Sequence, residues 1–150
     1  MRARGFVAGI WMVGAACSGD KTTGPTTSHQ IAGPWTYETR SLQDGVSTTC
    51  ATTGTVVTLT QGGIAFSGST AGGTITCSNT SGTFSGSLGT GQVQSGTIHG
   101  DSISFYIGGS TWHNVGTFVT PDSATGIVNV IFVVGGNQYI LVGYWYSKRQ

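Results

Sequence analysis

Charged residues are scarce in this sequence: Asp, Glu, Lys and Arg make up 7% of its 150 residues, whereas about 25% is usual in soluble domains. Two of the six basic residues, Arg2 and Arg4, stand at the very start, so the rest of the chain carries four bases against five acids. Binding to nucleic acid needs clustered Lys and Arg that neutralise phosphates. The sequence therefore excludes a nucleic-acid partner.

The sequence also lacks the motifs on which common catalytic and metal sites are built. It contains no Gly-x-Ser-x-Gly elbow, no Gly-rich phosphate loop followed by a helix, and no His-Glu-x-x-His or Cys-x-x-Cys spacing. Asp44, Asp101 and Asp122 each adjoin Gly or Pro, which is typical of turns. His99 and Asp101 are spaced to share one strand face, but the turn between them favours a solvated pair, and His113 reads as a surface residue. We predict no enzyme activity, no catalytic residue, no metal and no cofactor.

No segment after the N-terminus shows a helical period, and apolar residues instead alternate with Ser, Thr and Gly. The alternating positions include Trp35, Tyr37, Val57, Leu59, Ile103, Phe105 and Ile107. Strand-length segments recur every 8 to 12 residues or so, with Gly at the turns. We predict one all-β domain over 32–150, an antiparallel up-and-down β-barrel of about eight strands, with a β-sandwich as the alternative. Residues 72–91 fit either two short strands or one strand and a loop.

The C-terminal region is apolar on both faces over 127–134 and again over 139–146. The Gly-Gly-Asn-Gln interruption between these segments favours a buried hairpin over a transmembrane helix. Strands that are apolar on two faces need cover on two faces, so we expect a second copy, a lipid surface or another partner against the outer face. The residues predicted for this interface are Val128, Val130, Phe132, Val134 and Tyr144.

The N-terminus has the features of a secretory signal peptide over 1–16: two arginines, a short apolar run and small residues before a cleavage point. The apolar run is too short to span a bilayer, which needs about 20 residues. Residues 14–17, Gly-Ala-Ala-Cys, resemble the lipobox of bacterial lipoproteins. That resemblance implies a lipid on Cys17, which becomes the mature N-terminus. The family places a large aliphatic residue where this chain has Gly14, so ordinary cleavage after Ala16 stays the alternative.

The three cysteines suit this interpretation, because an odd cysteine in an exported chain needs an explanation. If Cys17 carries a lipid, Cys50 and Cys77 remain to pair with each other in an oxidising compartment; two buried free thiols are the alternative. The polar segment 17–31 is predicted to be a flexible tether. Ser18 after the cysteine resembles lipoproteins sent to the outer membrane, so we predict a protein anchored to the outer membrane or the cell surface.

Gly33-Pro34-Trp35 at the first strand, together with a basic residue in the last strand, resembles the lipocalin and avidin-like group of barrels. The resemblance implies that Trp35 closes the barrel floor and stacks beneath Lys148 or Arg149, a cation–π contact. Since no catalytic motif is present, we expect a binding role: a small barrel with apolar residues inside could hold one small apolar ligand, for which we predict Trp35, Phe66, Phe105 and Phe118 as lining residues. The alternative is a filled barrel that acts as an interaction or scaffold module through the outer face of the C-terminal hairpin. A homo-oligomer is a further expectation.

Overall fold

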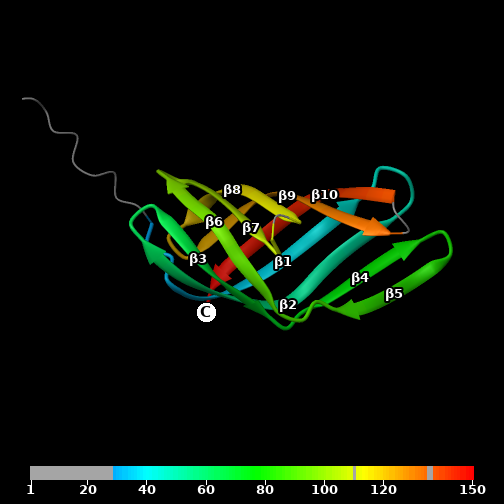
Figure 1. Ribbon diagram of the computed structural model, residues 1–150, viewed down its shortest axis with the longest axis horizontal. Coiled ribbons are helices and arrows are strands. Elements are labelled where there is room, and N and C mark those ends of the chain that lie inside the picture. Colours follow the sequence, from blue (N-terminus) through cyan, green and yellow to red (C-terminus); the bar gives the residue numbers. More distant parts are fainter. Residues whose placement is uncertain (1–28, 110, 135–136) are drawn as a thin grey trace, which may run out of the picture.

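The computed structural model describes residues 29–109, 111–134 and 137–150, and Figure 1 shows their arrangement. The predicted signal peptide, Cys17 and residues 17–28 of the predicted tether lie outside this range. The strands are β1 (Gly33–Gln43), β2 (Thr49–Gly62), β3 (Ala65–Ala71), β4 (Thr74–Asn79), β5 (Gly82–Ser87), β6 (Gly91–His99), β7 (Ser102–Ile107), β8 (Trp112–Thr120), β9 (Ser123–Val134) and β10 (Asn137–Arg149). Within the described residues no helix is long and apolar enough to cross a membrane.

Eight of the strands close into an antiparallel barrel. Their order is β1-β10-β9-β8-β7-β6-β3-β2, and a further pairing of β1 with β2 joins the two ends of the sheet. Closure removes the free edges that an open sheet would expose. The predicted up-and-down barrel of about eight strands is thus confirmed, and the β-sandwich alternative is wrong.

The two remaining strands, β4 and β5, lie within the segment 72–91. Of the two predicted alternatives for this segment, two short strands is the correct one. The first part of β2 (49–53) pairs with β4, and its second part (56–62) pairs with β3. Between β3 and β4 stand Gly72 and Gly73, whose positive φ angles of 67° and 96° break the strand without a side-chain penalty. β5 pairs with β4, and β6 pairs with β3. The β4–β5 hairpin therefore continues the paired strands β3 and β6 beyond the barrel.

The barrel therefore has two different ends. We call floor the end at which β1 begins and β10 ends, and mouth the opposite end, at which β6 and β8 begin and β7 ends. The long strands β1, β2, β9 and β10 run on past the mouth, and with β4 and β5 they form an extension on the right of Figure 1. The short strands β6, β7 and β8 have no counterpart there, so the mouth lies where the barrel meets the extension.

The alternation predicted from the sequence places large side chains inside the barrel. Trp35, Tyr37 and Trp145 are buried and belong to one continuous core cluster. Trp145 packs against two glycines that face each other across β8 and β9, Gly116 and Gly126. A Cβ atom on either glycine would lie 2.6 Å or 2.8 Å from the indole ring, so only glycine leaves room for this side chain.

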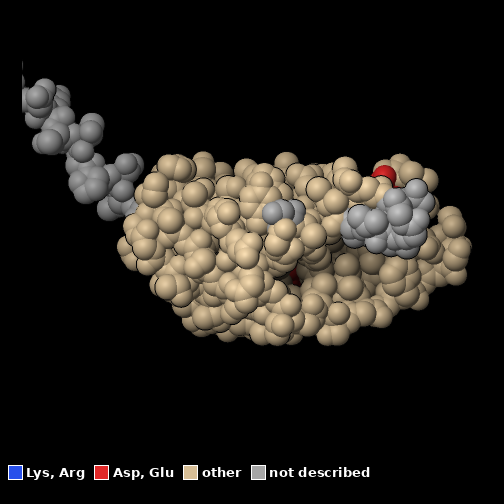
Figure 2. Space-filling view, in the orientation of Figure 1, with Lys and Arg blue, Asp and Glu red and all other residues tan. Residues whose placement is uncertain are grey.

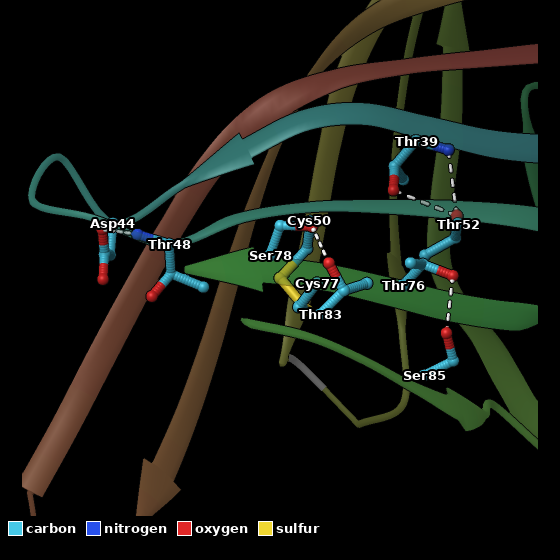
Figure 3. The surroundings of a disulfide bond; sticks show 10 residues. All are labelled: Thr39, Asp44, Thr48, Cys50, Thr52, Thr76, Cys77, Ser78, Thr83 and Ser85. Carbon is cyan, nitrogen blue, oxygen red and sulfur yellow. Dashed lines mark hydrogen bonds between the residues drawn. A yellow bond between two sulfur atoms is a disulfide. The ribbon is translucent and has the colours of Figure 1, made fainter. Parts of the chain in front are cut away.

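A disulfide joins β4 to the start of β2 within the extension. Cys50 on β2 and Cys77 on β4 are direct cross-strand partners with Cα atoms 4.0 Å apart, and Figure 3 shows the bond among neighbouring Thr and Ser side chains. The predicted pairing is confirmed. Paired hydroxyls then connect β4 to β5: Thr76 with Ser85 at 3.0 Å, and Ser78 with Thr83 at 3.0 Å.

The loop between β1 and β2 is organised by one carboxylate. Oδ1 of Asp44 accepts hydrogen bonds from the backbone N–H groups of Val46, Ser47 and Thr48, at 2.9, 3.0 and 3.1 Å. These bonds stabilise the charged form and lower the pKa of Asp44 to about 2. The predicted turn role of Asp44 is confirmed.

Candidate functional site

The four aromatic residues predicted to line a ligand cavity fill the floor half of the barrel themselves. Trp35, Phe66, Phe105 and Phe118 are all buried. The ring of Phe105 lies 5.8 Å from that of Phe66 and 5.4 Å from that of Trp145, between ring centroids. The cavity left among them measures about 20 Å³, which is enough for one water molecule. The filled-barrel alternative therefore describes this end of the molecule.

The segment 29–32 closes the floor from below. Ile31 is buried in the core, and its carbonyl accepts a hydrogen bond of 2.8 Å from Nε1 of Trp35. The ring of His29 stacks on Phe118 with 3.9 Å between centroids. The folded domain therefore already includes 29–31, which the sequence analysis wrongly assigned to the tether. Alternation could not reveal this, because a single apolar residue in a polar segment has no period.

The predicted contact between Trp35 and a basic residue of the last strand is present. The guanidinium carbon of Arg149 lies 4.9 Å from the centroid of the Trp35 ring, within the range of a cation–π contact. The same guanidinium donates to the carbonyls of Ala32 and Gln30 and pairs with Asp122 at 2.9 Å. Arg149 thus holds the floor segment in place, and Lys148 faces outward on β10.

Halfway up the barrel the interior turns polar. The hydroxyl of Tyr37 donates to Oδ1 of Asn114 at 2.6 Å, and both groups are buried. Burial raises the pKa of Tyr37 far above its usual value. One inward position further toward the extension, the hydroxyls of Thr39 and Thr52 lie 3.0 Å apart, and Oγ1 of Thr52 also accepts the Thr39 backbone N–H at 2.9 Å.

Next to Tyr37 lies a pocket of about 130 Å³ at the mouth, where the surface is hollowed next to the extension (Figure 2). We call it the mouth pocket. It is lined by Tyr37, Thr55, Thr70, Leu88, Thr90, Gly91, Ile107, Gly108 and Trp112. These residues come from the barrel strands, from the connection between β5 and β6, and from the turn between β7 and β8. None of the nine carries a charge.

One polar atom at the mouth pocket has no partner. The side chain of Thr55 is 4% exposed, and its Oγ1 makes no hydrogen bond within the described part of the chain. A buried hydroxyl without a partner costs about 1 to 3 kcal/mol. Gly73 covers this atom so closely that a Cβ there would lie 2.1 Å from it. Thr55 is therefore a lining residue whose buried hydroxyl has no hydrogen-bond partner among the described residues.

The titratable side chains of the described residues do not gather at the pocket. Asp101 pairs with His29 at 2.9 Å, at the floor, and not with His99. His113 stacks on Tyr106 with 4.4 Å between centroids, on the outer face of β7 and β8. Across 29–109, 111–134 and 137–150 no three His, Cys, Asp or Glu side chains come together as metal ligands would.

The prediction that Val128 and Val130 lie on the outer face of the C-terminal hairpin is wrong. Val128 and Val130 point into the barrel and are 0% and 5% exposed. Tyr144 does face outward and is 64% exposed, whereas the side chains of Phe132 and Val134 lie outside what the structure describes. Because β9 is apolar on both faces, its sequence could not show which face points inward.

The outward apolar side chains that the structure reveals form what we call the outer patch. Its members are Val115, Ile127, Ile131, Ile140, Val142, Tyr144 and Tyr146, on β8, β9 and β10, each between 37% and 64% exposed. Two shallow hollows adjoin it, one of them running along β10 beside the β1–β2 loop. The candidate sites are therefore the mouth pocket and the outer patch.

Comparison of the chain with protein-family models, with curated proteins and with solved structures gives no match. The function has to be inferred from these two sites.

Proposed function

We propose that this chain is an exported, lipid-anchored barrel protein that binds a compact, neutral molecule in the mouth pocket and catalyses no reaction. The observation that carries the binding proposal is the pocket of about 130 Å³ at the end where inward side chains become small. An engineered cavity of about 150 Å³ takes up benzene. A ligand of single-ring size therefore suits the mouth, while the floor of the barrel has no such room.

The chemistry of the lining narrows the ligand further. Leu88, Ile107 and Trp112 supply apolar contact, and Thr55, Thr70 and Thr90 supply hydroxyl groups. A charged ligand in a site without an opposite charge would lose its hydration without compensation. The pocket thus favours an uncharged ring that carries a hydroxyl or similar group, able to hydrogen-bond with the pocket hydroxyls. This replaces the expectation of a purely apolar ligand.

The anchoring proposal is supported by the cysteines. Cys50 and Cys77 are bonded to each other, so Cys17 is the one cysteine left over. A disulfide of this kind is typical of proteins in oxidising compartments, and a lipobox-like sequence surrounds Cys17. A protein at the outer membrane or the cell surface accounts for all three observations.

The anchor is tested by expressing the full chain and its Cys17→Ala variant in a bacterium and separating membranes from soluble extract. We expect the native chain in the membrane fraction and the variant in the soluble fraction. A variant that still requires detergent for extraction contradicts a lipid on Cys17.

Ligand binding is tested by two-dimensional NMR of the full-length Cys17→Ala chain titrated with benzyl alcohol, phenol and a methyl glycoside. We expect saturable shifts of the Trp112 indole N–H and of the Leu88 amide, and little change at Trp35 and Trp145. Leu88→Trp should abolish the shifts because the larger side chain fills the pocket. The matched control is Val119→Trp, at an exposed position on β8.

Two outcomes would overturn the pocket assignment. One is the absence of saturable shifts with all three probes. The other is a set of shifts centred on Trp35 and Trp145, which would place the ligand in the floor half of the barrel.

A second candidate function rests on the outer patch. An exposed apolar surface of this kind indicates a protein that binds a partner through its outer face. Such binding does not require an empty barrel interior. The two functions use different surfaces and do not exclude each other.

A further inference from the structure

The members of the outer patch lie near one another on three neighbouring strands. On the outward face, Tyr144 of β10 lies opposite Ile127 of β9, and Ile127 lies opposite Val115 of β8. Two outward positions further toward the extension, Ile140 lies opposite Ile131. Cross-strand partners have Cβ atoms about 4.5 to 5.5 Å apart, so each of these sets of partners lies close together. Between the two sets, Val142 lies opposite Asn129 and Asn129 lies opposite His113, so polar side chains interrupt the patch on β8 and β9.

The opposite wall of the same barrel is built differently. The outward side chains in the middle of β2, β3 and β6 are polar and exposed: Thr58, Thr60, Ser67, Ser69, Gln92 and Gln94. On this wall, hydroxyl and amide side chains face the water. The outward side chains of β8, β9 and β10 are therefore more apolar than those of the opposite wall.

The size of the patch matches a protein interface. Seven large apolar side chains, each about half exposed, offer on the order of 600 Å² of apolar surface per molecule. Two such surfaces pressed together bury about 1,200 Å², which is the lower limit for a specific and stable protein–protein interface. A partner of the same kind and size thus covers the patch without help from other surfaces.

The charges at the edge of the patch favour a second copy as that partner. On β1, Glu38 lies opposite Tyr146 and Arg40 lies opposite Tyr144, with 3.6 Å between the two charged groups. If the twofold axis of a face-to-face pair lies across the strands, between Glu38 and Arg40, the β1 strands of the two copies lie over each other in opposite directions. Arg40 of one copy then faces Glu38 of the other, so the edge is complementary to itself.

A lipid surface fits this edge less well, because anionic lipids attract an excess of basic residues. Here one base stands beside one acid, and Lys148 lies further toward the floor, beyond the patch. We therefore propose that two copies of this chain pair face to face through the outer patch, with Tyr144 and Ile127 at the centre and reciprocal Glu38–Arg40 contacts at the edge.

The pairing is tested by sedimentation of the full-length Cys17→Ala chain across a range of concentrations, without detergent. We expect a reversible monomer–dimer equilibrium with a dissociation constant of about 1 to 100 µM. Tyr144→Lys should weaken the dimer at least about tenfold, because it buries an unpaired charge. The matched control is Ser69→Lys, an exposed position on the polar wall, which should leave the dimer unchanged.

The edge contacts are tested by exchanging charges. Glu38→Arg alone should weaken the dimer, since it faces Arg40 of the other copy, and Glu38→Arg combined with Arg40→Glu should restore it. Far-ultraviolet circular dichroism and melting curves check that each variant is folded.

A chain that stays monomeric at about 1 mM overturns the proposal, and so does a dimer that Tyr144→Lys leaves intact. If the chain instead binds zwitterionic or anionic vesicles and loses that binding in Tyr144→Lys, the patch belongs to a lipid surface and the dimer is equally refuted. None of these outcomes affects the mouth pocket, whose lining residues lie outside the patch.

Discussion

The floor and the mouth of this barrel come from the same strands and the same alternation, yet one end is filled and the other is open. At the floor, the inward positions hold Trp35, Phe66 and Phe118, and about 20 Å³ remains empty. At the mouth, the inward positions include Thr55 and Thr70, and about 130 Å³ remains. The inward side chains are smaller at the mouth, and the short strands β6, β7 and β8 have their mouth-side ends there.

This contrast indicates that the two ends of the barrel contribute differently to stability. An eight-stranded barrel has an interior just wide enough for its own side chains to fill. Large rings at the floor therefore produce a dense core, and small hydroxylated residues at the mouth leave space and unpaired polar atoms. We expect the floor to dominate stability and the mouth to tolerate change, and the following predictions test that difference.

The largest effect should come from a floor tryptophan. Trp35→Ala removes a buried ring, its hydrogen bond to Ile31 and its contact with Arg149, so we expect a loss of about 3 to 5 kcal/mol in the free energy of unfolding. Trp112→Ala at the half-buried mouth position should cost about 1 kcal/mol. Urea unfolding of both variants measures the difference, and equal losses would contradict the contrast between the two ends.

Reduction of the disulfide should have the next largest effect, and a local one. The bond joins cysteines 27 positions apart, and its loss should lower the free energy of unfolding by about 3 to 4 kcal/mol on the chain-entropy model. Amide hydrogen exchange should rise first in β4 and β5, while the floor strands stay protected. If melting is unchanged after confirmed loss of the bond, the stabilising role is refuted.

Two threonines on β2 should respond in opposite ways. Thr52→Val deprives the backbone N–H and the hydroxyl of Thr39 of their partner, and we expect a loss of about 1 to 3 kcal/mol. Thr55→Val removes a hydroxyl without a partner among the described residues, so stability should stay constant or rise by up to about 1 kcal/mol. Thermal melting separates the pair, and a large loss in Thr55→Val would show that this hydroxyl is satisfied in solution.

The smallest effect should appear at acid pH in the loop between β1 and β2. The pKa of Asp44 is lowered to about 2 in the folded protein from 3.8, so its carboxylate stabilises the fold above about pH 4, and this contribution disappears as the pH falls to about 2. Asp44→Asn should lose this pH dependence while the floor remains intact. Melting temperatures of both proteins from pH 6 to pH 2 provide the measurement, and parallel curves would contradict it.

Much of the fold could be read from the sequence because alternation survives in most strands. Trp35, Tyr37 and Phe105 were predicted to be inward-facing by their period of two, and they are. The disulfide followed from counting cysteines. The β4–β5 hairpin was ambiguous, since Ser, Thr and Gly alternate without contrast between faces.

The sites were harder to predict for physical reasons. In β9 both faces are apolar, so the inward position of Val128 depended on pairing with neighbouring strands and not on its own sequence. The mouth pocket depends on Leu88 and Thr90 in a connection, which no periodicity describes. One usable signal was present: Thr55 stands two residues before Val57, a small polar side chain at an inward position.

The closure of the floor by residues 29–32 has a consequence for orientation. The chain enters the barrel on the side that Arg149 and Trp35 seal. In a molecule held at its N-terminus, as proposed, the attachment point is therefore at the sealed end of the barrel and the opening is at the opposite end. An attachment at that end leaves the opening accessible to solutes.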